Sequence, residues 1–255
     1  MQLDQVKALI TGGVSGLGLA AARHLVRSGG QVILLDINDE AGQKAVSELG
    51  ASARYLATDV TDENAVQTAV AEAVEWMGAL NVAVNCAGII GAGRVLGREA
   101  PMALDNFSHV IQVNLVGAFN VCKAAAAAME HNEPGPDGER GVIVSTASVA
   151  AFDGQIGQAA YSASKAGIVG MTLPIAREFT RIGVRVMAVA PGIFHTPMVG
   201  GMPEQVQESL AASIPFPKRL GRPEEFAELV GHIVENGYLN GETIRLDGAV
   251  RLAPK

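Results

Sequence analysis

The sequence has few cysteines, few aromatic residues and few charges for its length. Of 255 residues, two are cysteine, 4% are aromatic and 18% are charged. Cys86 and Cys122 form no CxxC pair and no disulfide framework, which favours a reducing compartment. The net charge is −7 and no cluster of Lys or Arg is present, which argues against nucleic acid and anionic membranes as main partners.

We also expect no targeting signal from the first residues of the sequence. The first ten residues, MQLDQVKALI, contain no basic segment followed by a long apolar run, so we expect no signal peptide. With no transit sequence visible either, we expect a cytoplasmic protein. No apolar run reaches the roughly 20 residues that cross a bilayer, so we expect no association with membranes.

The chain does have a high hydrophobic content, 49%, arranged as short apolar runs between helical patterns. This alternation predicts an α/β fold in which helices flank both faces of a parallel sheet. We expect one domain over residues 1–255, with ligands bound at the carboxyl ends of the strands. The seven predicted strands lie at 7–11, 31–35, 53–57, 80–84, 142–144, 184–189 and 243–246.

A glycine-rich turn follows the first predicted strand. Residues 11–18 read TGGVSGLG and lead into a helical pattern. Gly12 permits a tight turn, Gly16 lets the backbone approach a phosphate, and Gly18 lets the helix pack on the sheet. The start of the helix supplies N–H groups and a positive dipole end for a pyrophosphate. The spacing GxxxGxG differs from the more common GxGxxG, and for this motif alone an ordinary strand-to-helix turn is the alternative.

Asp36 ends the second predicted strand, eighteen residues after Gly18. This is close to the spacing of an acid that binds the adenosine ribose of a dinucleotide. A carboxylate there accepts hydrogen bonds from the ribose hydroxyls and repels a 2′-phosphate. Because the neighbours Ile37 and Asn38 are not basic, the pattern predicts NAD rather than NADP. The alternative is an aspartate that only terminates a strand.

Tyr161 and Lys165 lie four residues apart in a predicted helix, so their side chains share one face. Ser148 follows the strand at 142–144 and can reach the same point. A free tyrosine has a pKa of about 10, too high for a base near neutral pH. A nearby ammonium lowers that pKa and suits the group to acid/base catalysis. A Tyr/Lys pair at this spacing also arises by chance, so the prediction depends on the other motifs.

These motifs occur together with Asp59-Val60, with NCAG at 85–88 and with Asn114. The combination resembles the short-chain dehydrogenase/reductase family over about 7–251. The resemblance implies a Rossmann fold, strand order 3-2-1-4-5-6-7 and a homotetramer. It also implies that Tyr161 is the acid/base and that Lys165 lowers the pKa of Tyr161 and binds the nicotinamide ribose. Ser148 would position the substrate oxygen, and Asn114 would support a water-mediated proton relay.

Three longer segments, at 82–88, 145–177 and 239–249, are similar to a subgroup of that family, the type II 3-hydroxyacyl-CoA dehydrogenases. That subgroup uses NAD and oxidises the 3-hydroxyl of short or branched 3-hydroxyacyl-CoA thioesters, with slower action on some steroids. The resemblance implies substrate contacts from Ser148, Gln155, Gln158 and Tyr161, and no metal. The cofactor contacts that it implies are Gly12, Ser15, Gly16, Leu17, Gly18, Asp36, Asp59, Val60, Cys86, Ala87, Gly88, Tyr161, Lys165, Pro191, Phe194 and Thr196.

Residues 193–217 are rich in Met, Pro, Phe and Gly and predict an adaptable apolar lid over the substrate. The loop at 91–101 lacks the lysine-rich insertion of animal members of the subgroup, and His195 stands where a small residue is expected, which leaves the acyl-chain preference open. Alternatives within the family are a 3-oxoacyl-carrier-protein reductase and a hydroxysteroid dehydrogenase. An alternative of another class is a regulatory NAD-binding protein without catalysis, against which the intact Ser148, Tyr161 and Lys165 argue.

Overall fold

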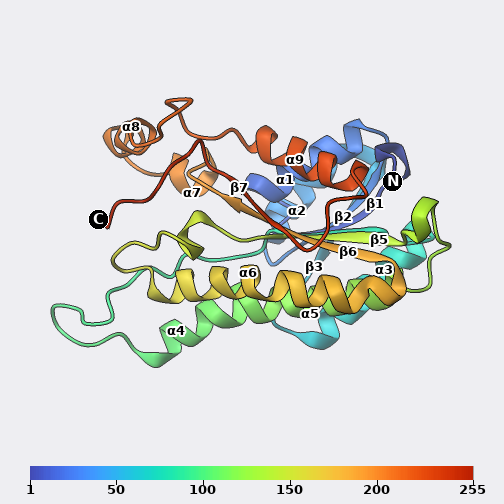
Figure 1. Cartoon of the computed structure of the whole chain (residues 1–255), viewed down its shortest axis with the longest axis horizontal. Coiled ribbons are helices and arrows are strands. Elements are labelled where there is room, and N and C mark those ends of the chain that lie inside the picture. Colours follow the sequence, from blue (N-terminus) through green and yellow to red (C-terminus); the bar gives the residue numbers. More distant parts are fainter. Residues whose placement is uncertain (255) are drawn as a thin grey trace.

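The computed structural model describes residues 1–254; the side chain of Met198, within the predicted lid, lies outside that description. Seven parallel strands form one sheet in the order β3-β2-β1-β4-β5-β6-β7 (Figure 1). This is the order implied by the family resemblance. The strands are β1 (Lys7–Thr11), β2 (Gln31–Asp36), β3 (Ala53–Ala57), β4 (Val82–Asn85), β5 (Gly141–Thr146), β6 (Val184–Pro191) and β7 (Thr243–Leu246).

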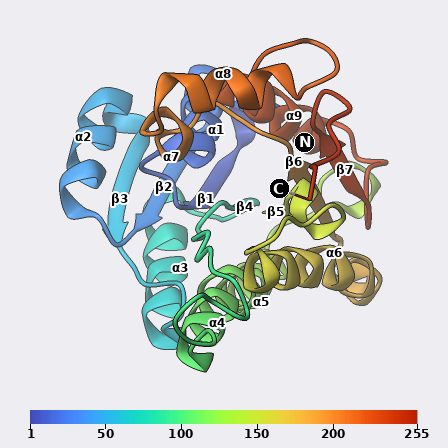
Figure 2. The same ribbon diagram turned by 90° about the vertical axis from the view of Figure 1, so that its left-hand side faces the viewer.

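Helices cover both faces of the sheet, as Figure 2 shows. One layer contains α1 (Gly16–Arg27), α2 (Asp39–Leu49) and α9 (Pro223–Glu235). The other contains α3 (Glu63–Met77), α4 (Leu104–Ile111), α5 (Gly117–Met129) and α6 (Ala159–Phe179). Two short helices, α7 (Pro197–Gly200) and α8 (Glu204–Ala212), lie in the predicted lid. The predicted doubly covered Rossmann fold is confirmed.

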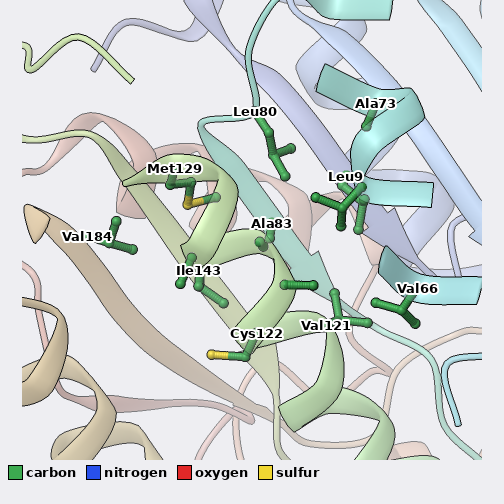
Figure 3. Packing of buried hydrophobic residues seen from close by; sticks show 14 of the residues in the cluster. Leu9, Val66, Ala73, Leu80, Ala83, Val121, Cys122, Met129, Ile143 and Val184 are labelled. Atoms are coloured by element: carbon green, nitrogen blue, oxygen red, sulfur yellow. The ribbon is translucent and has the colours of Figure 1, made fainter. Parts of the chain in front are cut away.

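Alternation along each strand sends successive side chains to opposite layers. In β1, Leu9 packs toward α3 and α5, whereas Ala8 and Ile10 pack toward α1 and α9. Figure 3 shows Leu9 and Ile143 of the strands in the same buried cluster as Val121 of α5. Each large apolar side chain buried in this way contributes roughly 1.5–3 kcal/mol to stability, which explains why strands covered on both faces are apolar throughout.

The continuous helical segment Leu104–Met129 contains a change of helical pitch. A π-helical stretch, Gln112–Val116, joins α4 to α5. The combined helix Leu104–Met129 is long and apolar enough to cross a membrane by length and composition, which corrects the expectation that no such run exists. Half of its most apolar stretch is buried in the protein, where α5 packs on α3, β4 and β5. A core helix passes the same test, so this helix carries no membrane assignment.

Two strand boundaries differ from the prediction. β6 continues through Pro191 instead of ending at Val189, because Pro191 pairs with Leu246 of β7. β4 begins at Val82 rather than at Leu80. Pro174 lies inside α6. The extra residues of β6 carry the chain to the edge of the sheet where the lid begins.

Candidate active site

A cleft of about 640 Å³ runs along the carboxyl ends of the strands, at the edge of the sheet that faces the viewer in Figure 2. Its walls come from the ends of β1, β2, β4, β5 and β6, from the first turns of α1 and α6, and from the lid. Every residue predicted to contact the cofactor lines this cleft. The predicted substrate residues Ser148, Gln155, Gln158 and Tyr161 line it as well.

The glycine turn between β1 and α1 is packed too closely for side chains. A Cβ on Gly12, whose φ is +61°, would lie 2.8 Å from the backbone nitrogen of Ala87. A Cβ on Gly18 would lie 2.3 Å from the backbone oxygen of Gly12. Contacts this short require glycine at both positions. The turn therefore fixes the start of α1 against the end of β4.

Gly16 differs from those two glycines because a Cβ there would make only ordinary van der Waals contacts. With φ at +50°, a Cβ there would meet its nearest atoms, on Thr196 and Pro197 of the lid, only at 3.6–3.7 Å. Ser15, which precedes α1, makes no side-chain capping bond to the first turn. The first N–H groups of a helix have no partners within the helix, and here they face the cleft beneath the lid. This cradle fits a pyrophosphate.

Asp36 stands at the end of β2 and lines the cleft beside Ile37, whose side chain is 76% exposed. One carboxylate oxygen of Asp36 accepts a hydrogen bond from the backbone nitrogen of Asn38 at 3.1 Å. Within the described part of the chain, Lys165 is the one Lys or Arg that lines the cleft. The end of the cleft at Asp36 is therefore suited to ribose hydroxyls and offers no side-chain cation for a 2′-phosphate.

Lys165 is buried and projects from α6 toward the end of β5. Its Nζ donates a hydrogen bond to the backbone oxygen of Thr146 at 2.7 Å and lies 5.9 Å from the centre of the Tyr161 ring. Burial lowers the pKa of Lys165 to about 8. The one-turn spacing of the sequence thus places both groups on the cleft side of the same helix.

Tyr161 and Ser148 meet where α6 approaches the loop after β5. Burial raises the pKa of Tyr161, and a hydrogen bond with Ser148 opposes that rise. Ser148 also accepts a hydrogen bond from the backbone nitrogen of Ala150 at 3.1 Å, which fixes its side chain. Burial is the larger of the two effects, because removing a phenolate from water is costly, so the pKa of Tyr161 is raised overall. The lowering of that pKa by Lys165 stays a prediction.

Asn114 lies in the π-helical stretch, behind the cleft wall rather than in it. Its Oδ1 accepts a hydrogen bond from the backbone nitrogen of Ile89 at 2.8 Å, and its Nδ2 donates to the backbone oxygen of Ile89 at 2.9 Å and to Ser164 at 3.1 Å. A Cβ on Gly88 would lie 3.1 Å from Asn114 Oδ1 and 3.6 Å from Lys165 Nζ. Asn114 therefore holds the backbone beside Lys165, and its predicted part in a proton relay stays a prediction.

The two predicted substrate glutamines bond to each other and to the end of the chain. The backbone nitrogen of Gln155 donates to the side-chain oxygen of Gln158 at 3.0 Å. The side-chain nitrogen of Gln155 donates to the backbone oxygen of Ala253 at 2.9 Å. The Gln155 carboxamide is thus oriented by the segment that follows β7.

Several cleft residues carry no signal in the sequence. They have aliphatic or aromatic side chains outside any motif, and they come from three separate segments: Ile90, His109 and Leu252. His109 offered the one available clue, because it precedes Asn114 by five residues on the same continuous helix. Among residues 1–254, no cluster of three or more His, Cys, Asp or Glu side chains is arranged to hold a metal ion.

Comparison with known proteins identifies the family. The family model described as short chain dehydrogenase matches residues 6–207. The 3-hydroxyacyl-CoA dehydrogenase type-2 of Homo sapiens is 53% identical over 249 residues, covering 97% of this chain and 95% of that protein. The protein of the same name from Drosophila melanogaster is 52% identical over 249 residues, covering 97% and 98%.

A solved structure agrees with these sequence matches. The crystal structure of 3-hydroxyacyl-CoA dehydrogenase type-2 from Mycobacterium avium has a TM-score of 0.94 to this fold at 43% identity, covering 97% of this chain and 96% of that one. The matches span the sheet, the glycine turn and the Ser148–Tyr161–Lys165 group. The chain therefore belongs to the short-chain dehydrogenase family, and it is an oxidoreductase that acts on secondary alcohols with a nicotinamide cofactor.

Proposed function

We propose that the protein catalyses the NAD-dependent oxidation of the 3-hydroxyl of short or branched 3-hydroxyacyl-CoA thioesters, and the reverse reduction. The observation that carries the cofactor choice is Asp36, which lines the cleft where no Lys or Arg side chain accompanies it. The substrate class rests on the 53% identical relative named 3-hydroxyacyl-CoA dehydrogenase type-2. The adenosine ribose of the cofactor and the acyl chain of the substrate would bind at opposite ends of the cleft.

The cleft residues divide between the parts of NAD. The start of α1, at Gly16 and Leu17, would bind the pyrophosphate, and Asp36 would bind the adenosine ribose. Asp59 and Val60 would flank the adenine, and Lys165 would bind the nicotinamide ribose. When bound, the nicotinamide supplies or accepts the hydride.

Three side chains of this chain handle the alcohol. Ser148 Oγ, fixed by the backbone nitrogen of Ala150, would hold the substrate oxygen. Tyr161 would take the hydroxyl proton during oxidation and return it during reduction. Because burial raises the pKa of Tyr161, its phenol holds the proton at neutral pH, which favours reduction there and oxidation at higher pH. Lys165 lies close enough for its charge to stabilise the phenolate when that proton leaves.

The substrate end of the cleft has an apolar surface suited to an acyl chain. Its aliphatic side chains come from the loop after β4, from the lid and from the segment after β7. They include Ile90, Ile193, Val199, Met202, Leu210 and Leu252. A thioester with a short or branched acyl chain could place its 3-hydroxyl at Ser148 and its alkyl end against these side chains.

We propose a homotetramer in the cytoplasm. Exposed apolar side chains on the outer face of the α4–α5 and α6 layer support self-association: Leu104 is 75% exposed, Phe119 49% and Leu173 43%. Light scattering of the purified protein would give the mass of the assembly. A monomer at micromolar concentration would contradict this part of the proposal, and fractionation of the source cells would test the location.

The first test is the oxidation of NADH and of NADPH, in parallel, with acetoacetyl-CoA as substrate. Fast turnover with NADH alone would support both the acyl-CoA assignment and the ribose role of Asp36. Equal use of NADPH would contradict the role of Asp36. Turnover of a carrier-protein thioester with NADPH in its place would favour a carrier-protein reductase. Tight binding of NADH without acyl-CoA turnover would leave the family intact and direct the search to steroids and other secondary alcohols.

A further inference from the structure

The segment that follows β7, residues 247–254, returns to the cleft and is called here the return segment. In Figure 1 it is the dark red stretch that ends on the same side of the molecule as α7 and α8. Leu252 of this segment is partly buried and lines the cleft, together with Met202 and Leu210 of the lid. The return segment is thus part of the cleft wall at the substrate end.

One set of bonds ties the return segment to the loop after Ser148. The side-chain nitrogen of Gln155 donates to the backbone oxygen of Ala253 at 2.9 Å. The backbone nitrogen of Ile156 donates to the backbone oxygen of Pro254 at 3.0 Å. The two bonds join consecutive residues of the loop to consecutive residues of the return segment. They therefore hold the return segment alongside the loop rather than at a single point. Leu252, one residue before Ala253, is placed against the cleft as a result.

A second set of bonds starts from Arg245 in β7. Its guanidinium donates to Asp153 at 2.6 Å, to Asp247 at 2.8 Å and to the backbone oxygen of Val250 at 3.0 Å. Its central carbon also lies 5.1 Å from the centre of the Phe152 ring. Asp153 belongs to the loop after Ser148, whereas Asp247 and Val250 belong to the return segment. Arg245 therefore fixes both the loop after Ser148 and the return segment to β7.

We propose that the return segment closes the substrate end of the cleft and that Leu252 sets the length of acyl chain that the cleft accepts. The inference rests on the proposed acyl-CoA substrate and names the side chain that would meet the alkyl end. Hydrogen bonds to Val250 and Ala253, on the two sides of Leu252 in the chain, fix the position of this leucine. The volume of its side chain then decides how many methylenes of the acyl chain fit in the cleft. Arg245 acts as a positioning residue, since it touches the walls and not the substrate.

The test compares kcat/KM for acetoacetyl-CoA and for 3-oxodecanoyl-CoA, both with NADH, in Leu252→Ala and Leu252→Trp. One extra or missing methylene in an apolar pocket changes kcat/KM by about 10- to 200-fold. We expect Leu252→Ala to raise the ratio of long-chain to short-chain kcat/KM about tenfold, and Leu252→Trp to lower it about tenfold. Leu252→Met keeps the volume and should keep the ratio. Tyr238→Ala, at a fully exposed side chain outside the cleft, is the control.

Arg245→Lys provides an independent arm, because lysine can reach one aspartate but cannot make the forked contacts. We expect it to raise the long-chain to short-chain ratio about threefold, while the KM for NADH stays within twofold of the wild-type value. A purely structural role would lower kcat/KM for both thioesters equally. A ratio within twofold of wild type in Leu252→Ala and Leu252→Trp, in proteins with unchanged melting temperatures, would overturn the proposal.

Failure of the proposed function is a separate outcome. If the wild-type protein turns over neither thioester, the acyl-CoA assignment fails, and the same variants are then compared on methyl ketones with short and long alkyl chains. A shift of the chain-length ratio on ketones would retain the role of Leu252 without the thioester. An unchanged ratio there would remove that role as well.

Discussion

The cleft has two halves that are built differently. The cofactor half consists of strand ends and the start of α1, where backbone meets backbone at distances that exclude any side chain at Gly12 and Gly18. The substrate half consists of four segments far apart in sequence: residues 89–101, 152–158, 193–217 and 247–254. These segments meet through a few hydrogen bonds, such as the one from the backbone nitrogen of Gly93 to the oxygen of Gly157 at 2.8 Å.

The difference follows from what each half must bind. A dinucleotide has the same shape in every catalytic cycle, so a fixed backbone cradle serves it, and only glycine satisfies the cradle. Substrates differ among relatives, and a wall of loops can change its side chains without disturbing the sheet. The proposed catalytic group, Ser148, Tyr161 and Lys165, stands where the two halves join. Substitutions in the two halves should therefore fail in different ways.

The largest effect is expected at the junction, from Tyr161→Phe. Loss of the phenolic hydroxyl removes the proton path, so kcat should fall roughly 10²- to 10⁴-fold. NADH binding, followed by fluorescence titration, should change by less than threefold, because the cofactor cradle is untouched. Tyr238→Phe is the matched control, since that side chain is fully exposed. Retained turnover in Tyr161→Phe would refute the assignment of the acid/base.

One added methyl group should be enough to disrupt cofactor binding in the cofactor half. In Gly18→Ala the new Cβ would meet the backbone oxygen of Gly12 at 2.3 Å, so the turn must shift. We expect NADH affinity to fall more than tenfold and the melting temperature to fall. Gly170→Ala is the matched control, because a Cβ there has nothing within 4 Å on α6 and helical alanine is more stable by about 1 kcal/mol. A Gly18→Ala protein that binds NADH normally would contradict the close-packed cradle.

A smaller effect in the same half is expected from Asp36→Ala. Without the carboxylate the ribose loses its hydrogen-bond acceptor and a 2′-phosphate is no longer repelled. The Kd for NADH should rise about tenfold, and the Kd for NADPH should fall, so that the two approach each other. Asp39→Ala removes another carboxylate, at the first residue of α2, and is a suitable control. An unchanged ratio of the two dissociation constants would remove Asp36 from ribose binding.

The same contrast explains how much could be predicted from the sequence. The strands, the glycine turn, Asp36 and the Tyr161–Lys165 pair were predictable because each depends on local geometry: a period, a positive φ, a one-turn spacing. The order of the strands came from the family resemblance, because β1 lies between β2 and β4 only after long crossovers. The positions of Asp59 and Thr196 in the cleft agree with that resemblance.

The substrate half could not be predicted in the same way. Leu252 reaches the cleft through bonds to Gln155 and Ile156, almost a hundred residues earlier, and no local pattern encodes such a contact. The raised pKa of Tyr161 was missed for a related reason, because it depends on the depth of burial rather than on the spacing to Lys165. Asn114 was predicted for its position, but it bonds to Ile89 from within a π-helical stretch that the sequence did not reveal.

The smallest expected effect concerns residues 218–225, called here the stem of the lid, which join the lid to α9. Arg219 donates to both oxygens of Glu225, at 2.8 and 2.5 Å, and the backbone nitrogen of Arg222 donates to the same carboxylate at 2.8 Å. The hydrogen bonds from Arg219 are the main cause that lowers the pKa of Glu225 from 4.5 to about 2. A carboxyl whose pKa is lower in the folded state stabilises the fold above its unfolded pKa. That stabilisation is lost as the pH falls from about 4.5 to about 2.

Arg219→Gln should therefore flatten the dependence of stability on pH in that window. We expect the melting temperature of the wild-type protein to fall more steeply between pH 4.5 and pH 2.5 than that of the variant, by a few degrees at most, because both side chains are about a third exposed and water screens the pair. Arg181→Gln, which loses a more exposed pair with Glu130, should leave the slope unchanged. Parallel curves for wild type and Arg219→Gln would show that the lid stem does not depend on this ion pair. Since Arg219 contacts no part of the glycine turn, NADH affinity at neutral pH should be the same in both proteins, and a change there would mean that the two halves are coupled through the lid.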